Sequence, residues 1–235
     1  MINIINQINM VNELSPVLKF IADATRQDEP IPSISDLSAQ LGISTASVRE
    51  QLEVPKELGF VEVHTRTGIQ KHDFCLTRPL TLSMTYGLRV DPELFQEYAS
   101  LRRQLEIAYW YEACALLEKS HIQALQELVE RANWKINQNP VVMPMLEHRK
   151  FHLTIYRPLN NRVLNSVLET YWDLYEEFRI YDYRNHEYLE NVWNYHRQML
   201  EAISSKAYEK GYEALVTHFE LIKTFKKADL RQRFE

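Results

Sequence analysis

Residues 33–69 carry two short amphipathic patterns and then an alternating one, and few folds accommodate that order. Ser33 is typical of a helix N-cap, so the first helix is expected to begin directly after it. Gly42 predicts the end of that helix because glycine adopts the left-handed conformation at little cost. Ser44 then caps a second helix, which is expected to end at Gly59. The segment therefore predicts two helices joined by a tight turn.

The residues that follow have the pattern of a strand, a polar tip and a return strand. Residues 60–64 show the alternation of a strand, and a compact tip with one glycine, Gly68, comes next. Helix, turn, helix and wing in this order predict a winged helix-turn-helix. That fold presents its second helix to the major groove of DNA.

The start of the second helix carries short polar side chains and an arginine, which suit phosphate oxygens and base edges. Arg66, at the expected wing tip, is positioned for a contact with the DNA backbone or the minor groove. The candidate DNA-contacting residues are Ser44, Thr45, Ser47, Arg49, Arg66 and Gly68.

Two features of the same region count against DNA binding. Pro55 lies inside the second helix, where proline removes a hydrogen bond and costs about 3 kcal/mol unless the helix kinks or restarts. The first 76 residues hold six Lys or Arg against ten Asp or Glu. Most DNA-binding modules are basic, because neutralising phosphates supplies much of their affinity. A helix-turn-helix that contacts only protein is therefore the alternative interpretation.

The chain beyond residue 90 contains almost no turn-forming glycine, since Gly211 is the only glycine after Gly87. Scarce glycine and a 3.6-residue periodicity together predict an all-helical second domain. The chain is thus expected to be mainly α, with a winged helix-turn-helix domain over 1–75, a loosely packed linker over 76–90 and a six-helix antiparallel effector-binding bundle over 91–228. The expected helices cover 91–117, 120–137, 144–156, 161–183, 186–204 and 206–223.

Composition favours a cytoplasmic protein without membrane association. Cys75 and Cys114 have neither metal-binding nor redox spacing, which is typical of a reducing compartment. The N-terminal residues lack the pattern of a signal peptide, and no stretch approaches the roughly 18 apolar residues of a membrane span.

Four histidines of the second domain have separations that suit a metal site. His148 and His152 are four residues apart on one expected helix, so their rings lie about 6 Å apart on the same face. His196 and His218 lie nine and thirteen residues from a turn near Ser205. In an antiparallel helix pair this leaves an axial offset of about 6 Å, which two rings can bridge. Neutral imidazole is the commonest transition-metal ligand. For each histidine alone, a solvated or singly hydrogen-bonded side chain is the alternative.

The order of winged helix, linker and helical domain resembles the GntR-type transcriptional regulators of the FadR C-terminal-domain (FCD) class. The matching residues are spread over roughly residues 33–220. They are Ser44, Val48, Arg49, Glu50, Gly59 and Gly68 in the first part, and Arg102, Leu105, Glu106, Phe151, His152, Asn161, His196 and His218 in the second. The resemblance implies a homodimer that binds a palindromic, double-stranded operator, and a helical bundle that binds a metal and often a small carboxylate.

Four positions depart from the family pattern, and one of them is Pro55, which replaces a helix former. His148 stands where the family usually has an aspartate. This exchange removes a negative charge and should favour Zn or Ni over Mn, or it abolishes the first ligand. Thr45 and Ser47 replace the usual Arg and Pro, so the operator sequence does not follow from the resemblance.

A cation facing the metal would bind a carboxylate effector by bidentate pairing. Arg102 is the first candidate, with Glu106 one helical turn later as its orienting partner. Arg157 and Asn161 flank the first histidine helix and are further candidates. For each, an ordinary surface or interhelix ion pair is the alternative.

The sequence thus favours a ligand- or metal-responsive transcriptional regulator over an enzyme. A di-iron enzyme needs two Glu-x-x-His motifs, and only Glu118 and His121 have that spacing. The Gly-x-Ser-x-Gly elbow of many hydrolases is missing from the sequence. The second interpretation is a helical dimeric metal-binding module, or a metalloenzyme, that does not bind DNA.

Overall fold

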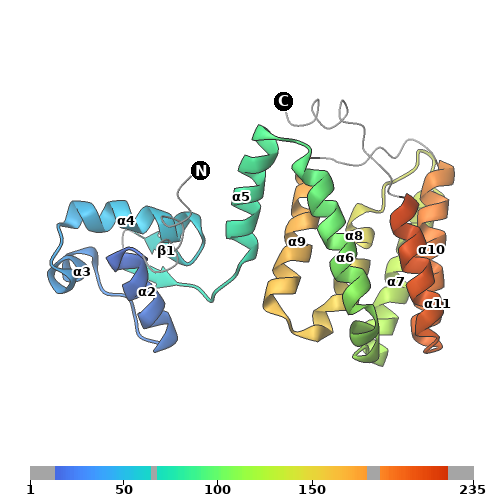
Figure 1. Ribbon diagram of the computed structural model, residues 1–235, viewed down its shortest axis with the longest axis horizontal. Coiled ribbons are helices and arrows are strands. Elements are labelled where there is room, and N and C mark those ends of the chain that lie inside the picture. Colours follow the sequence, from blue (N-terminus) through green and yellow to red (C-terminus); the bar gives the residue numbers. More distant parts are fainter. Residues whose placement is uncertain (1–13, 65–67, 179–185, 222–235) are drawn as a thin grey trace, which may run out of the picture. The chain divides into compact units, whose positions relative to one another are not determined.

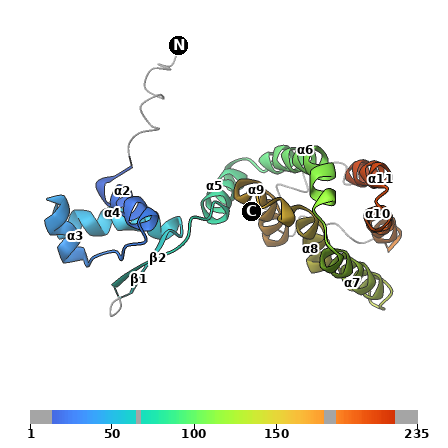
Figure 2. The same cartoon turned by 90° about the horizontal axis from the view of Figure 1, so that it is seen from below.

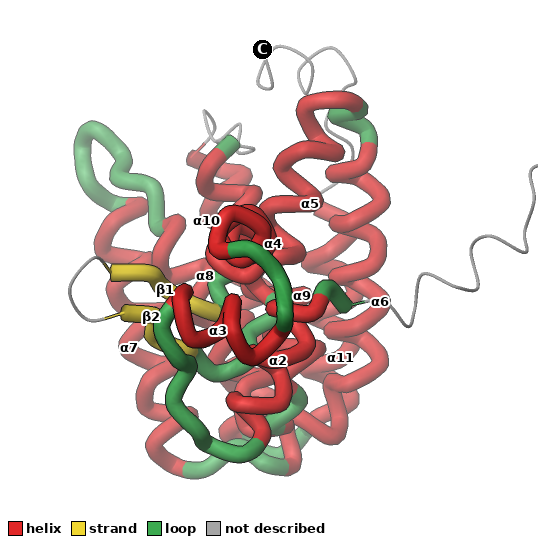
Figure 3. The backbone as a smooth tube through the Cα atoms, turned by 90° about the vertical axis from the view of Figure 1, so that its left-hand side faces the viewer, coloured by secondary structure: helices red, strands yellow, loops and turns green. Residues whose placement is uncertain are grey.

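The computed structural model describes residues 14–64, 68–178 and 186–221, and these are mainly helical, as predicted (Figure 1). The chain divides into two compact units, one ending at Pro79 and one beginning at Leu80. Within the described residues the only strands, β1 and β2, belong to the first unit (Figure 3). No helix among these residues has the length and apolar character needed to cross a bilayer.

The first unit is a winged helix-turn-helix. Its elements are α2 (Pro16–Arg26), α3 (Ile34–Leu41), α4 (Thr45–Glu57), β1 (Val61–His64) and β2 (Gly68–Lys71). The two strands pair antiparallel, with Val61 opposite Lys71 and His64 opposite Gly68. Buried apolar side chains from all five elements form its core: Val17, Ile21, Ala24, Ile31, Leu37, Val48, Leu52, Val61 and Ile69.

Local hydrogen bonds explain the turn between α3 and α4. The Ser33 hydroxyl accepts from the Asp36 amide at 3.2 Å, and the Ser44 hydroxyl accepts from the Ser47 amide at 3.1 Å. Gly42 ends α3 with φ at +66°, in the left-handed region. The predicted caps and the predicted turn glycine are confirmed.

Pro55 does not divide the second helix. α4 runs through it to Glu57, and Gly59 follows with φ at +75°. Pro55 is buried, and its carbonyl accepts from the Phe60 amide at 2.8 Å. The helix therefore does not restart at Pro55, which lacks the N–H that would donate to the carbonyl four residues earlier.

α2 was missing from the expected helices. The Ser15 hydroxyl accepts from the Leu18 amide at 3.3 Å, and Pro16 occupies the first helical position. A serine N-cap followed by proline is a regular start signal, so the sequence did contain the information.

The second unit is a helical bundle. Its helices are α5 (Thr77–Val90, which begins just before the boundary), α6 (Leu94–Ala115), α7 (Lys119–Ile136), α8 (Met145–Tyr156), α9 (Arg162–Glu177), α10 (His186–Ser204) and α11 (Tyr208–Leu221), with a short 3-10 turn, η2 (Arg157–Leu159), after α8. The described helices agree with the six predicted from periodicity except at their ends. The ends predicted at residues 183 and 223 lie outside the described residues, although α9 itself ends within them, at Glu177.

The segment 76–90, predicted to be a loosely packed linker, is instead mostly the helix α5. Leu80, Met84 and Leu88 recur every four residues and face the core of the second unit, and Leu88 is fully buried. The Thr81 hydroxyl also donates to the Thr170 hydroxyl at 3.3 Å. An apolar stripe of helical spacing outweighed the turn-forming residues of this segment.

α10 and α11 lie side by side and are joined by a three-residue turn (Figures 1 and 2). Gly211 of α11 allows a close approach here. A Cβ at this position would lie 2.5 Å from an atom of the Trp110 ring and 3.1 Å from the Ala202 Cβ. Trp110 is fully buried, and its indole donates to the Tyr208 carbonyl at 2.9 Å, so the ring is fixed in place.

We expect Gly211→Ala to destabilise the protein by about 1–3 kcal/mol, because overpacking against a fixed ring outweighs the better helix propensity of alanine. Urea unfolding of the wild type and the variant measures this. Thr217→Ala, on the exposed side of the same helix, is the control and should change the free energy of unfolding by about 0.5 kcal/mol or less. A Gly211→Ala protein of unchanged or higher stability would contradict the close approach.

Candidate metal centre and DNA-facing helix

Four buried histidines converge inside the second unit. α8 contributes His148 and His152, α10 contributes His196 and α11 contributes His218. One ring nitrogen from each lies within 4.8 Å of the others. His148 is 6% exposed and the other three are fully buried. The structure thus brings together all four of the histidines selected from the sequence.

Hydrogen bonds determine which nitrogens are available in two of these rings. The Nδ1 atom of His196 lies 2.8 Å from the Val192 carbonyl, which only accepts, so this nitrogen donates. The Nδ1 atom of His152 lies 2.6 Å from a Glu106 oxygen and donates to that carboxylate. In neutral rings both Nε2 atoms then carry a lone pair. These two atoms lie 3.2 Å apart, so a shared cation would satisfy both.

The carboxylate of Glu106 is ionised. Burial by itself would raise its pKa, but the Arg102 guanidinium and His152 outweigh burial and hold the pKa below its usual value. The charged carboxylate therefore accepts from Arg102 Nε and from His152 Nδ1, each at 2.6 Å. This pairing fixes the orientation of the His152 ring.

The remaining two rings have no such partners. Among the described residues, His148 Nε2 and both ring nitrogens of His218 are buried without a hydrogen-bond partner. An unsatisfied buried polar atom costs about 1–3 kcal/mol, so these atoms need an explanation. Ligation of a metal ion by one nitrogen of each ring would account for His148 Nε2 and for one of the two His218 nitrogens.

All four rings are neutral near pH 7. Burial is the largest cause, and it lowers the pKa of each ring below the usual value; for His148, His196 and His218 the pKa falls well below it. For His148, His196 and His218, repulsion from neighbouring rings lowers the pKa further. For the pKa of His152, Glu106 opposes the effect of burial and Arg102 adds to it. Neutral imidazoles can coordinate a metal without first losing a proton. The donor set fits a transition-metal ion.

Aromatic side chains surround the histidines. The ring of Trp172 lies 4.8 Å from that of His148, and Trp193 and Phe151 lie 4.6 and 4.7 Å from that of His196. These walls keep water away and strengthen charge interactions inside the centre.

Arg102 lies in the same aromatic surroundings. It is 1% exposed, and its guanidinium carbon lies 4.3 Å from the Trp172 ring centroid and 4.4 Å from that of Tyr171. Its Nε donates to Glu106, but its Nη2 is buried without a hydrogen-bond partner. Arg102 and Glu106 are thus joined to the histidines, through the contact of Glu106 with His152.

The other two effector candidates make different contacts. The side chain of Arg157 is 65% exposed and pairs with Glu169 at 3.4 Å. The Asn161 side chain accepts from the Leu164 amide at 3.0 Å and caps α9. We therefore assign local structural roles to both. Glu118 and His121 likewise form the N-terminal cap of α7, where the Glu118 amide donates to His121 at 3.0 Å.

The N-cap and first turns of α4 expose three of the six candidate DNA-contacting residues. Ser44, Thr45 and Arg49 are exposed, whereas Ser47 is half-buried and accepts from the Gln51 amide group at 3.1 Å. Gly68 begins β2 with φ at +83°. Arg66 lies outside the described residues.

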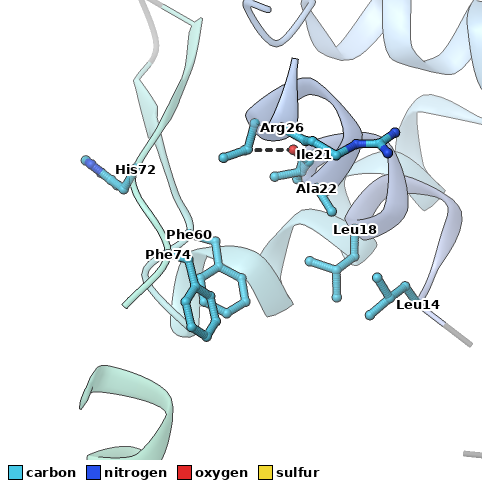
Figure 4. A pocket seen from close by; sticks show the side chains of 9 residues that line it. Leu14, Leu18, Ile21, Ala22, Arg26, Phe60, His72 and Phe74 are labelled. Atoms are coloured by element: carbon cyan, nitrogen blue, oxygen red, sulfur yellow. Dashed lines mark hydrogen bonds between the residues drawn. The ribbon is translucent and has the colours of Figure 1, made fainter. Parts of the chain in front are cut away.

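A separate apolar pocket lies on the first unit, between α2 and the residues that flank the sheet (Figure 4). The rings of Phe60 and Phe74 lie on one side, with their centroids 5.9 Å apart. The lining residues are Leu14, Leu18, Ile21, Ala22, Thr25, Arg26, Phe60, His72 and Phe74. None of the candidate DNA-contacting residues is among them, so this pocket is distinct from the exposed start of α4.

Comparison with known families identifies the second unit. Residues 97–221, more than half of the chain, match the model of the FCD domain. The chain belongs to the FCD domain family. Together with the winged helix ahead of this domain, that makes it a GntR-type transcriptional regulator of the FCD class.

Two solved structures share the fold. GntR of Streptococcus agalactiae is similar with a TM-score of 0.62 and 16% identity, over 88% of this chain and 96% of that one. McbR/YncC of E. coli is similar with a TM-score of 0.50 and 19% identity, over 95% of this chain and 100% of that one. No curated protein matches the chain by sequence.

Sequence reasoning missed the contact of Glu106 with His152. The four-residue spacing of Arg102 and Glu106 pointed to their pairing, which the structure contains at 2.6 Å. Glu106 and His152 are 46 residues apart and lie on different helices, so no spacing rule could have revealed their hydrogen bond.

We expect Glu106→Gln to lower the affinity for zinc about 10–100-fold, because the amide no longer holds His152 as a charged acceptor does. Competition with a chromophoric chelator measures the affinity. Glu127→Gln, an exposed change on α7, should leave it unchanged. Circular dichroism checks folding, since Arg102 loses its countercharge. A folded Glu106→Gln protein with wild-type zinc affinity would contradict the positioning role.

Proposed function

We propose that this regulator responds to a divalent transition metal held by His148, His152, His196 and His218. The observation that carries the proposal is the set of buried ring nitrogens that point at one another and lack other partners. Four neutral nitrogen ligands favour Zn or Ni over Mn, which prefers oxygen ligands. The bound metal would supply a positive charge and an acceptor for anionic ligands.

We further propose that the effector is a small carboxylate that binds beside the metal. The support is Arg102, whose buried Nη2 is a donor without an acceptor. A guanidinium pairs well with a carboxylate through parallel hydrogen bonds. Glu106 accepts from Arg102 Nε, so Arg102 Nη2 stays available to donate to the ligand.

DNA recognition is assigned to α4 in a homodimer that binds a palindromic operator. Arg49 supports this, because it is exposed and has no carboxylate partner in the part of the chain that the structure describes. Such a side chain can reach a phosphate or a guanine edge. Gly68 and Arg66 of the wing are assigned the neighbouring backbone contact.

The proposed mechanism couples the two activities through the bundle. A bound ion would tie together α8, α10 and α11, which contribute the four ligands. If metal and effector bind one arrangement of the dimer better than another, they shift the population between the two states and thereby the operator affinity.

A helical metal-binding module that never binds DNA is the second candidate function. The excess of acidic residues over basic ones in the first 76 residues favours it. The two candidates differ at Arg49, since only a DNA-binding protein needs this side chain on the exposed face of α4.

We expect Arg49→Ala to weaken binding to the operator about tenfold or more, because a direct phosphate or base contact is lost. Gel-shift titration with the promoter region adjoining the protein's own gene measures this. Arg26→Ala removes the same charge from the exposed surface of α2 and should have a much smaller effect. Equal effects of the two changes, or no operator binding by the wild type, would favour the second candidate function.

We expect His152→Ala and His196→Ala each to abolish stoichiometric metal binding, because each removes one of two facing ligand atoms. Metal content of the purified proteins, measured by inductively coupled plasma mass spectrometry after zinc loading and dialysis, tests this. His186→Ala, an exposed histidine at the start of α10, is the control and should retain the metal. Unaltered metal content in both the His152→Ala and the His196→Ala protein would contradict the proposed metal site.

A further inference from the structure

The pocket on the first unit is lined mainly by apolar side chains (Figure 4). It has a volume of about 330 Å³ and lies between α2 and the residues that flank the two strands. Two large side chains of its lining are strongly exposed, Leu14 at 55% and Phe74 at 50%. An open apolar surface of this kind is typical of a site that another element covers.

Helix α2 is apolar on two faces. Val17 and Ala24 belong to the core of the first unit. Leu14, just ahead of the helix, Leu18 and Ala22 recur every four residues and line the pocket instead. A helix with apolar residues on two faces is normally buried on both. Because a small unit buries a modest share of its apolar surface, a covered second face would also stabilise it.

Residues 1–13, which lie outside the described residues, lead directly into this pocket at Leu14. Their sequence is MINIINQINMVNE, with a charged side chain only at its last position. It repeats apolar residues at the spacing of one helix face: Ile4, Ile5, Ile8 and Val11. An uncharged stripe of this kind matches a pocket whose walls are hydrocarbon.

We infer that residues 1–13 form a helix that packs antiparallel to α2 of the same chain and fills the apolar pocket. Two helices joined by a loop of about two to five residues form an αα-hairpin, and residues 13–15 supply such a loop. α2 has 11 residues, about 16 Å, and a helix over residues 2–12 would have the same length. Counting outward from the loop places Val11 near Leu18, and Ile8 near Ala22.

The same helix would support the base of the wing. The His72 amide donates to the Phe60 carbonyl at 2.9 Å and extends the pairing of β1 and β2 by one hydrogen bond. Both residues line the pocket, so a helix seated there would shield this bond from water. Residues 1–13 thereby become part of the winged unit, although its helix-turn-helix pattern begins only at Ser33. The inference is independent of metal, effector and DNA binding.

The test is hydrogen exchange of the full-length protein, followed by mass spectrometry of its peptides. The amides of residues 2–12 should exchange about tenfold or more slowly than in a synthetic peptide of residues 1–13, which is too short to hold a helix alone. Ile8→Asn interrupts the apolar stripe and should remove most of this protection. Met10→Asn, on the opposite face of the same helix, is the matched control and should change it less than about threefold.

A second pair of variants tests the pocket. Ala22→Asp places a charge on the exposed wall near which Ile8 is expected, and should also remove the protection of residues 2–12. Ala39→Asp makes the same change on the exposed surface of α3, away from the pocket, and should preserve the protection. Unchanged exchange of the α4 amides in each variant shows that the unit is still folded.

A disulfide identifies the chain to which the filled pocket belongs. Cys114 is buried and Cys75 is exposed, so Cys75→Ser provides the background. In it, Ile8→Cys and Ala22→Cys together should form a disulfide within one chain, seen as a monomer of altered mobility on a non-reducing gel. A disulfide that links two chains, or none at all, would contradict packing within one chain.

Three results of the exchange experiment would overturn the inference. The first is exchange of residues 2–12 at the rate of the synthetic peptide. The second is equal loss of protection in Ile8→Asn and Met10→Asn, since the stripe would then not be the packed face. The third is full protection in Ala22→Asp, since the segment would then pack elsewhere. None of these results bears on the proposed metal centre or on operator binding.

Discussion

The carboxylate of Glu106 lies between two hydrogen-bond donors inside the bundle, and the arrangement of the metal centre depends on it. A fully buried carboxylate is tolerated only when both oxygens are paired. Arg102 serves one oxygen and His152 the other, each at 2.6 Å. Because His152 must donate through Nδ1, its Nε2 is left to face His196. One ion pair thus fixes a tautomer, a ring orientation and the separation of two ligand atoms.

The bundle supports this pair through packing that is unrelated to metal chemistry. The rings of Tyr171 and Trp172 flank the Arg102 guanidinium, with centroids 4.4 and 4.3 Å from its carbon. Such contacts stabilise a desolvated cation without consuming its hydrogen-bond donors. That is why Arg102 can be held firmly and still have a free Nη2. Side chains that look like core residues in the sequence are therefore also the walls of the centre.

The features that could be predicted from the sequence are those that depend on residues a few positions apart. Ser33, Gly42 and Ser44 act within a few residues of themselves, and the spacing of His148 and His152 follows from one helical turn, so these features could be read before the fold was known. The proximity of His218 to them depends on how three helices pack. Helix α5 was not predicted because turn-forming residues obscured its apolar stripe. For Glu106, the sequence analysis predicted the pairing with Arg102 on α6 but not the one with His152. Long-range contacts decided the position of His218 and the second partner of Glu106, whereas the stripe of α5 was a local signal that was overlooked.

The candidate ligands differ in how their side chains are held by the surrounding helices. His152 and His196 are each held by a hydrogen bond, whereas His218 on α11 has none among the described residues. α11 is bonded to α6 away from the centre: the Trp110 indole donates to the Tyr208 carbonyl at 2.9 Å, and Arg103 pairs with Glu220 at 2.8 Å. Apolar packing, with Leu215 and Phe219 buried, adds to these bonds, but in the part of the chain that the structure describes His218 has no directional bond at the centre itself. A bound ion would therefore give α11 a directional bond at the centre, where His152 and His196 already have one each.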